Sequence, residues 1–270
     1  MNARKAPGAV RVGIGGWTYA PWRGGTFYPK GLVQRRELEY ASRQLTAIEI
    51  NGTYYRAQSR QTYARWRDEV PDGFVFAAKA PMRIVKARDL SKVGGQVEGF
   101  IEGIAELGDR LGPLLWQFDG GPSLQRDVFA DFVAALPTDV DGRALRHVLD
   151  VRDPGFVDDA YVQLARRHGI AIVCTDSTEH PNLADVTADF VYARLMRSRA
   201  AIGKGYPDDE LDAWAGRTRT WAQGGMPSDL PVLASRAPER PREVFVFFIG
   251  AAKQRNPAAA VALQARLDAG

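Results

Sequence analysis

Cysteine and histidine are scarce in this chain of 270 residues, which holds one cysteine and three histidines. A single cysteine excludes a disulfide within the chain, and Cys174 stands in an apolar run, where we expect a small core residue rather than a nucleophile. The histidines are predicted at the start of a strand (His147), at the end of a helix (His168) and in a loop (His180). Zinc ligands converge on one point, so we do not expect a zinc site.

Long hydrophobic runs are also absent. No stretch has enough consecutive apolar residues to span a bilayer, and residues 1–7 lack the apolar segment of a secretory signal. We therefore expect a cytoplasmic protein with no membrane contact. Glycine pairs occur at Gly15-Gly16, Gly24-Gly25, Gly94-Gly95 and Gly120-Gly121, but none has the spacing of a phosphate loop or a dinucleotide fingerprint, so no cofactor is predicted.

The charge balance is mildly basic, with a net charge of +4 and an isoelectric point near 9.2. Such an excess attracts anions but is modest for a dedicated nucleic-acid binder. Positive residues gather late in the chain, at Arg194, Arg197, Arg199 and Lys204. This segment is predicted either to dock a phosphate or carboxylate or to be an ordinary solvated loop.

Eight short apolar runs, each ending in polar residues, alternate with helix-like stretches. The runs are Arg11–Trp17, Ala47–Asn51, Phe74–Ala80, Gly112–Phe118, His147–Asp153, Ile170–Ser177, Phe190–Met196 and Glu243–Ala251. Because several lack polar alternation, they are typical of strands buried on both faces. Eight strand-helix units predict an α/β fold, a single-domain TIM (β/α)8 barrel, over residues 11–270, preceded by a flexible segment at residues 1–10.

Amphipathic helices are expected between the strands. They are predicted at Gln34–Leu45, Gln61–Glu69, Gln96–Leu107, Arg126–Leu136, Asp158–His168, Asp208–Gln223 and Ala258–Leu267. Ser59 and Ser123 stand where N-terminal caps belong, and Pro257 opens the last helix. The stretch Glu179–Val186 is short and contains a proline, so only a turn or two of helix is expected there.

Polar residues at the carboxyl ends of the strands are the candidate site. Alternation along each strand predicts that one set faces the barrel axis. This set combines three carboxylates, three cations and two amides: Glu49, Asp150, Asp176, Lys79, Arg152, Arg194, Asn51 and Gln117. Buried charges are costly unless paired or used, so the set is either an ion-pair network or a reaction site, and its place at the strand ends favours a site.

Several ordered motifs resemble the YecE-like family, also called domain of unknown function 72. They are Gly15–Tyr19, Trp22–Gly24, Phe27–Pro29, Glu49–Tyr55, Phe76–Lys79, Leu115–Phe118, Asp150–Arg152, Asp176-Ser177 and Tyr192–Leu195. The resemblance spans nearly the whole chain and implies a TIM barrel related to sugar isomerases, with no established reaction. It also implies a pocket that adds Trp17, Tyr19, Trp22, Tyr54 and Tyr55 to the polar set. The sequence is identified as a divergent member, because Met196-Arg197 replaces the family's His-Gly pair and Phe248-Ile249-Gly250 replaces Phe-Asn-Asn.

The predicted function is acid/base chemistry on a small carbohydrate-like or phosphorylated metabolite. Glu49 or Asp150 would act as the base with Lys79 as electrophilic partner and Arg152 beside them. Other chemistries stay open. A glycosidase would use two carboxylates, a Schiff-base lyase would use Lys79 as nucleophile unless Glu49 or Asp150 neutralises it, and Mg²⁺ or Mn²⁺ could bind Glu49, Asp150 and Asp176.

A binding protein is the alternative class. Arginines at the mouth could contact the phosphates of a nucleic acid or nucleotide while the aromatic residues stack on bases. A catalytically silent barrel is the third hypothesis. The oligomeric state does not follow from the sequence.

Overall fold

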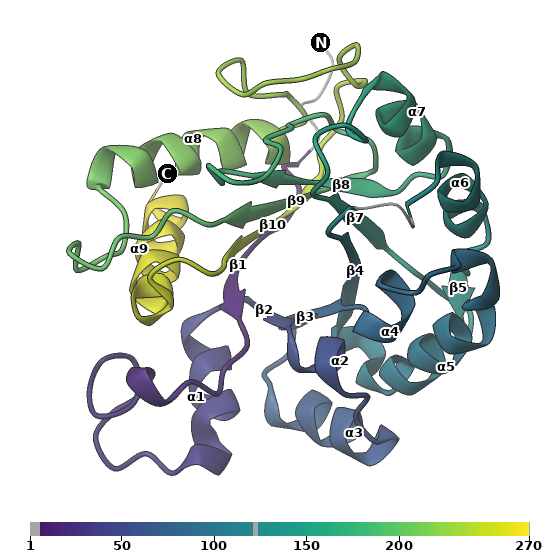
Figure 1. The fold of residues 1–270 in the computed structure, drawn as a ribbon. Helices are drawn as coiled ribbons and strands as arrows, with labels where there is room; N and C mark the ends of the chain where they lie inside the picture. Colours follow the sequence, from purple (N-terminus) through teal and green to yellow (C-terminus); the bar gives the residue numbers. More distant parts are fainter. Residues whose placement is uncertain (1–5, 121–123, 270) are drawn as a thin grey trace.

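A closed barrel of eight parallel strands forms the centre of the molecule (Figure 1). The computed structural model describes residues 6–120 and 124–269. The barrel strands are β1 (Val10–Gly15), β2 (Ala47–Ile50), β3 (Val75–Lys79), β4 (Leu111–Phe118), β7 (His147–Val151), β8 (Ala171–Thr175), β9 (Phe190–Leu195) and β10 (Glu243–Phe248). Their order around the barrel is β1-β10-β9-β8-β7-β4-β3-β2. The predicted TIM barrel is confirmed, with every strand in the predicted place.

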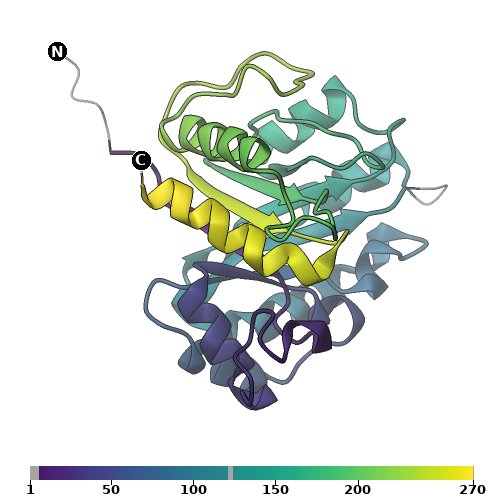
Figure 2. The same cartoon turned by 90° about the vertical axis from the view of Figure 1, so that its left-hand side faces the viewer.

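Helices surround this ring (Figure 1). They are α1 (Glu37–Gln44), α2 (Gly52–Tyr55), α3 (Arg60–Glu69), α4 (Met82–Val85), α5 (Gly94–Ile104), α6 (Arg126–Ala134), α7 (Asp159–Arg167), α8 (Asp208–Ala222) and α9 (Asn256–Asp268), with 3-10 turns at Ala20–Trp22, Gln34–Arg36, Leu90–Lys92, Ala105–Arg110 and Lys253–Arg255. The seven predicted helices are all present. Figures 1 and 2 show α8 beside α9, where Arg266 pairs with Asp208 and Asp212.

The predicted helix caps agree with the structure where they can be compared. The Ser59 hydroxyl accepts a hydrogen bond from the Thr62 amide at the start of α3, and Pro257 stands in the first turn of α9, where a missing amide hydrogen costs nothing. Ser123 lies outside the described residues. Ahead of β1, the amide of Gly8 donates to the carbonyl of Ala222.

Two local predictions need correction. Residues 176–189, all of which are described, form no helix, so the expected turn after β8 is wrong. Instead the buried Asp185 carboxylate accepts from the amides of Leu233 and Ala234, which ties this segment to the loop before β10. A small hairpin of β5 (Asp139–Val140) and β6 (Arg143–Ala144) was not predicted, although its Asp141-Gly142 turn, both residues with positive φ, is a favoured two-residue hairpin loop.

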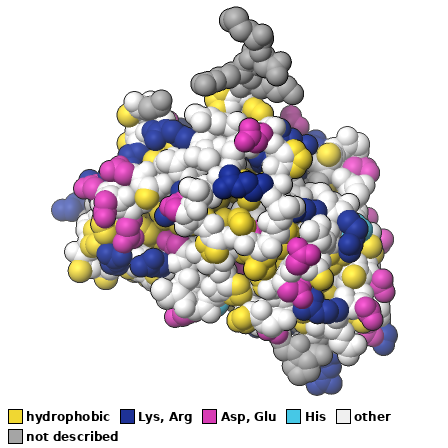
Figure 3. Space-filling view, turned by 90° about the horizontal axis from the view of Figure 1, so that it is seen from above, with side chains coloured by type: hydrophobic (Ala, Val, Ile, Leu, Met, Phe, Trp, Pro, Cys, Tyr) yellow, Lys and Arg dark blue, Asp and Glu magenta, His cyan; other side chains and the backbone are white. Residues whose placement is uncertain are grey.

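The surface carries both signs of charge in close mixture. On the face that Figure 3 shows, basic and acidic side chains are interspersed. Many form ion pairs, such as Arg199 with Glu210 and Lys204 with Asp208. Among the described residues, no helix is both long and apolar enough to cross a membrane.

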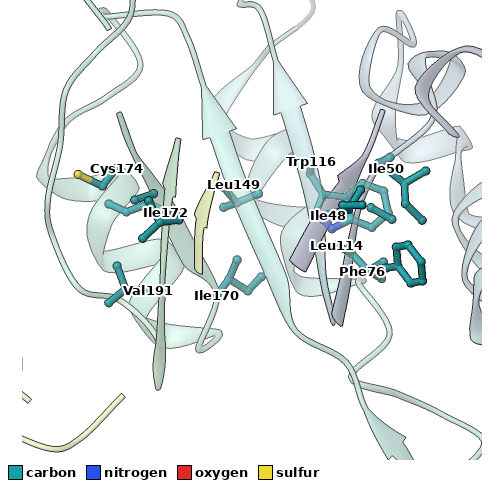
Figure 4. Close-up of a cluster of buried hydrophobic side chains, with 14 of the residues drawn as sticks. Ile48, Ile50, Phe76, Leu114, Trp116, Leu149, Ile170, Ile172, Cys174 and Val191 are labelled. Atoms are coloured by element: carbon teal, nitrogen blue, oxygen red, sulfur yellow. The ribbon is translucent and has the colours of Figure 1, made fainter. Parts of the chain in front are cut away.

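The main apolar layer lies between the strands and the helices (Figure 4). Cys174 belongs to it, near Ile172 and Val191, and burial raises the pKa of its thiol to about 12, as suits a core residue. His147 faces the same layer. Its Nδ1 accepts from the Trp116 indole at 3.0 Å and its Nε2 lies 2.7 Å from the Pro137 carbonyl, an arrangement that requires the neutral ring.

A second apolar layer fills the barrel itself, as expected for the packed interior of this fold. Phe245 and Phe247 stack in it, and Tyr192, which is in register with Phe245 on the neighbouring strand, packs against both rings. At the amino end, Glu243 pairs with Arg11 and Arg146, and the Arg146 guanidinium lies 5.0 Å from the centre of the Phe245 ring. The barrel interior is therefore closed by ion pairs and aromatic rings at its amino end, whereas its carboxyl end is polar.

Candidate functional site

Arg194 is the centre of the polar layer at the carboxyl end of the barrel. Its guanidinium donates two hydrogen bonds to Glu49, from Nε at 3.1 Å and from Nη2 at 3.0 Å, and one from Nη1 to Asp150 at 2.9 Å. The Tyr192 hydroxyl donates at 2.7 Å to Glu49 Oε2, the oxygen that also accepts from Arg194 Nε. Glu49 is fully buried, and its bidentate pair with Arg194 fixes the orientation of both side chains.

Asp150 and Gln117 complete the surroundings of Arg194. Asp150 also accepts from Arg152 Nε at 3.4 Å. The Gln117 carbonyl accepts from Arg194 Nη1 at 3.2 Å while its amide donates to Asp119. Both carboxylates at the barrel axis, Glu49 and Asp150, thus accept hydrogen bonds from arginine.

Lys79 has no such partner. In the described part of the chain it takes part in no ion pair, and its Nζ lies 3.8 Å from the centre of the Tyr54 ring. Burial, assisted by the positive charge of Arg194, lowers the pKa of Lys79 to about 8. This cation is therefore the one in the cluster that can lose its proton near neutral pH.

A cavity of about 340 Å³ opens above this cluster, a size suited to a small metabolite. It is lined by Gly15, Asn51, Tyr54, Tyr55, Lys79, Gln117, Arg152, Arg194, Phe248, Ile249, Gly250, Lys253 and Asn256. We call it the mouth cavity. A methyl group at Gly15 would come within 2.9 Å of Asn51 and Ile249, so glycine is required for these side chains to approach. Tyr55 is 78% exposed at the rim.

The loop after β10 contributes residues that the sequence analysis missed. Lys253 lies 4.8 Å from the centre of the Tyr19 ring. The Asn256 amide donates to the carbonyls of Phe248 and Gly250, while its buried Oδ1 has no partner among the described residues. The rule that barrel sites use all the loops at the carboxyl ends could have found both residues.

Asp176 lies away from the mouth cavity, contrary to the prediction. Along β8, Val173 belongs to the inner layer and Cys174 to the outer one, so Asp176 shares the outer side with Cys174. Its carboxylate accepts from the Tyr206 hydroxyl at 2.8 Å and from the Met196 amide, and burial raises the pKa of Asp176. It fixes the loop after β9.

Only some of the predicted aromatic residues lie at the mouth cavity. Tyr54 and Tyr55 line it, whereas Tyr19 contacts Lys253, which lines it. Trp22 is fully buried and donates to the Lys253 carbonyl. Trp17 packs edge-on against Trp66 and lines a separate hollow of about 750 Å³ between α1 and α3.

The donor set argues against the carboxylate metal site. Asp176 is on the wrong side of β8, and Glu49 and Asp150 are both held by Arg194. Within residues 6–120 and 124–269, no group of three or more His, Cys, Asp or Glu side chains is placed to hold a metal ion.

The fold and the site together define a TIM-barrel protein with a polar cavity at the carboxyl ends of its strands. The family model described as protein of unknown function DUF72 matches residues 11–270, and the chain belongs to that family. The resemblance to YecE-like proteins is thereby confirmed. No curated protein matches the sequence.

Solved structures of the same family are similar in fold. A DUF72 family protein from Thermotoga maritima MSB8 has 20% identity and a TM-score of 0.73, covering 96% of this chain and 99% of that one. A DUF72 family protein from Enterococcus faecalis V583 has 18% identity and a TM-score of 0.70, covering 97% of this chain and 98% of that one. At these identities the likeness supports the fold alone.

Proposed function

We propose that the mouth cavity binds a small anionic metabolite of carbohydrate type, such as a sugar phosphate or sugar acid, and that Lys79 exchanges a proton with it. The observation that carries this proposal is the Lys79 side chain, which lines the cavity and takes part in no ion pair among the described residues.

The charge balance of the cluster supports an anionic ligand. Glu49 and Asp150 supply two negative charges, whereas Arg194, Arg152 and Lys79 supply three positive ones. Lys253, which also lines the cavity, adds a further cation. A phosphate or carboxylate placed against these groups would complete the charge balance, because guanidinium and ammonium groups bind such anions through strong charge-assisted hydrogen bonds.

Amide groups around the same cavity support a ligand rich in hydroxyl groups. Asn51, Gln117 and Asn256 all line it. The exposed Tyr55 ring at the rim offers a flat face for a sugar to pack on.

The roles that we propose within the cluster differ from those predicted from the sequence. Glu49 is enclosed by Arg194 and Tyr192 and does not line the cavity, so we assign it to positioning Arg194. Asp150 has the same task between two arginines. We therefore assign proton exchange to Lys79. With a pKa of about 8, both its ammonium and its neutral amine are present near neutral pH, as a group that gives and takes a proton requires.

A thermal-shift experiment tests the proposal. Sugar phosphates, sugar acids, inorganic phosphate and neutral sugars are compared on the wild type, on Lys79→Met and on Lys204→Met, whose lysine pairs with Asp208 outside the cavity. A ligand at about 100 times its Kd should stabilise the wild type and the Lys204 variant by about 2.7 kcal/mol and the Lys79 variant much less. Equal shifts in all three proteins would contradict the proposal.

The same thermal-shift experiment, with short RNA added, tests whether the protein binds nucleic acid. Arg199 and Lys204, predicted as phosphate contacts, are engaged with Glu210 and Asp208. A stabilising effect of short RNA that falls steeply with salt, with no effect of sugar phosphates, would favour the binding-protein alternative.

A further inference from the structure

We infer that Lys79 reacts covalently with the carbonyl group of an aldehyde or ketone, so that the mouth cavity takes a phosphorylated or carboxylated carbonyl compound. This inference rests on the proposed function, because it uses the same cavity and the same cations to hold the anionic end of the substrate.

The first argument is the absence of a carboxylate partner. A lysine held in an ion pair stays protonated and cannot attack a carbonyl carbon. The candidates to hold it are Glu49 and Asp150. Both oxygens of Glu49 accept from Arg194, with Tyr192 as a further donor. One oxygen of Asp150, Oδ2, accepts from both Arg194 and Arg152. Within the described ranges, no ion pair includes Lys79, so its nitrogen is free to react.

The second argument is the surroundings of the nitrogen. Nζ lies against the face of the Tyr54 ring at the cavity floor, where it is half-buried. Burial is the main cause that lowers the pKa of Lys79, and the positive charges of Arg194 and Arg152 add to it. The carboxylates of Glu49 and Asp150 act in the opposite direction, and the resulting pKa is about 8. A useful fraction of the neutral amine is therefore present at physiological pH without a dedicated base.

The step balances without a redox partner. The ammonium of Lys79 gives one proton to a water molecule, and the nitrogen lone pair then attacks the carbonyl carbon while the carbonyl electron pair moves to oxygen. A second proton passes from nitrogen to that oxygen, which gives a neutral carbinolamine. The first proton returns from water to the hydroxyl group, the carbon-oxygen bond breaks as the nitrogen lone pair forms the double bond, and the oxygen leaves as water. One ammonium and one carbonyl thus become one iminium and one water, with the charge unchanged.

Lys253 provides a matched control in the same cavity. It too is half-buried, lies over an aromatic ring and has its pKa lowered by burial. Its ring partner Tyr19 lies in the loop after β1, and burial, without an arginine charge, lowers the pKa of Lys253. The inference assigns the reaction to Lys79 alone, because only Lys79 is flanked by Arg194 and Arg152.

The experiment is reductive trapping. The whole protein is incubated with glyceraldehyde 3-phosphate, treated with borohydride and examined by peptide mass mapping, which is tractable because the chain has seven lysines. We expect a secondary amine at Lys79 at least ten times more abundant than at any other lysine. Neutral glyceraldehyde should give at least ten times less. Lys253→Met should keep the adduct, and both Lys79→Met and Lys79→Arg should lose it.

The outcomes separate the two proposals. An adduct spread evenly over the lysines, or one that survives in Lys79→Arg, overturns the covalent inference. If glyceraldehyde 3-phosphate stabilises the wild type but leaves no adduct at Lys79, the inference fails while the binding proposal stands. If it neither stabilises nor reacts, and the sugar phosphates and sugar acids also give no shift, both proposals fail.

Discussion

The two ends of the barrel interior use the same residue types in different ways. At the amino end, Glu243 is shared by Arg11 and Arg146, all partly exposed, and Arg146 rests on phenylalanine rings. At the carboxyl end, Glu49 and Asp150 bind the buried Arg194, and a lysine is left without a partner beneath a cavity. The first arrangement closes the barrel, whereas the second leaves reactive groups available, in line with the division of labour between the two ends of TIM barrels.

The largest expected effect is on stability, and it differs between Arg194 at the carboxyl end and Arg146 at the amino end. Arg194→Met should destabilise the protein by about 3–5 kcal/mol, because it leaves the buried Glu49 without its cation and Asp150 with only the more distant Arg152. Arg146→Met should cost about 1 kcal/mol, since that pair is partly solvated. Urea unfolding at pH 7 measures both.

A rescue experiment sharpens this prediction. Adding Glu49→Gln to Arg194→Met should recover part of the lost stability, because a neutral amide is less costly to bury than an unpaired carboxylate. Additive losses in the double variant would show that the Glu49–Arg194 pair is not coupled as the structure indicates.

The next effect concerns His147, on the outer side of the barrel near the amino end. Burial lowers the pKa of His147, so below the ordinary value near 6.5 the unfolded chain binds the proton more readily than the folded one. Stability should therefore fall as the pH drops from 7 to 5. His147→Leu should lose about 1–3 kcal/mol at pH 7 by unpairing Trp116 and Pro137, and the acid dependence should weaken. An unchanged pH profile in the variant would contradict this assignment.

Lys79, at the carboxyl end, is expected to lower the stability of the protein, although the proposed function needs it. Its folded pKa, about 8, is below the ordinary 10.4, so its charged form costs folding free energy below pH 8, and this cost is relieved as the pH rises toward 10. Lys79→Met should therefore be more stable than the wild type by about 1 kcal/mol at pH 7, after allowance for solvent screening, with a smaller difference near pH 10. A less stable variant at pH 7 would argue for a hidden ion pair.

The sequence predicted the barrel well because eight apolar runs and their intervening helices are local patterns. It also placed Lys79, Gln117, Asp150 and Arg194 on the axis side, since in those strands the polar residue itself marks the alternation. In β8 two polar residues are adjacent at the end of the strand: Thr175 continues the inner side of Val173, and Asp176 continues the outer side of Cys174. The polar residues therefore do not decide the phase of the alternation, and the prediction for Asp176 took the wrong side.

The pairing within the site lay beyond the sequence. Glu49 and Arg194 are 145 residues apart, and no local pattern tells which cation a buried carboxylate will bind. For this reason the sequence left Lys79 paired with Glu49 or Asp150 as one hypothesis, whereas the structure gives both carboxylates to Arg194. The unpaired state of Lys79, on which both proposals depend, is a tertiary property.

The smallest expected effect returns to the amino end. Glu243→Gln should change stability by less than about 1 kcal/mol, because its partners stay partly hydrated and Arg146 keeps its contacts with the phenylalanine rings. Sugar-phosphate stabilisation in the thermal-shift experiment should be unchanged. Glu49→Gln, the same chemical change at the carboxyl end, should weaken that stabilisation by releasing one side of Arg194. Similar behaviour of the two variants would mean that the carboxyl-end cluster, like the amino-end one, serves only to close the barrel.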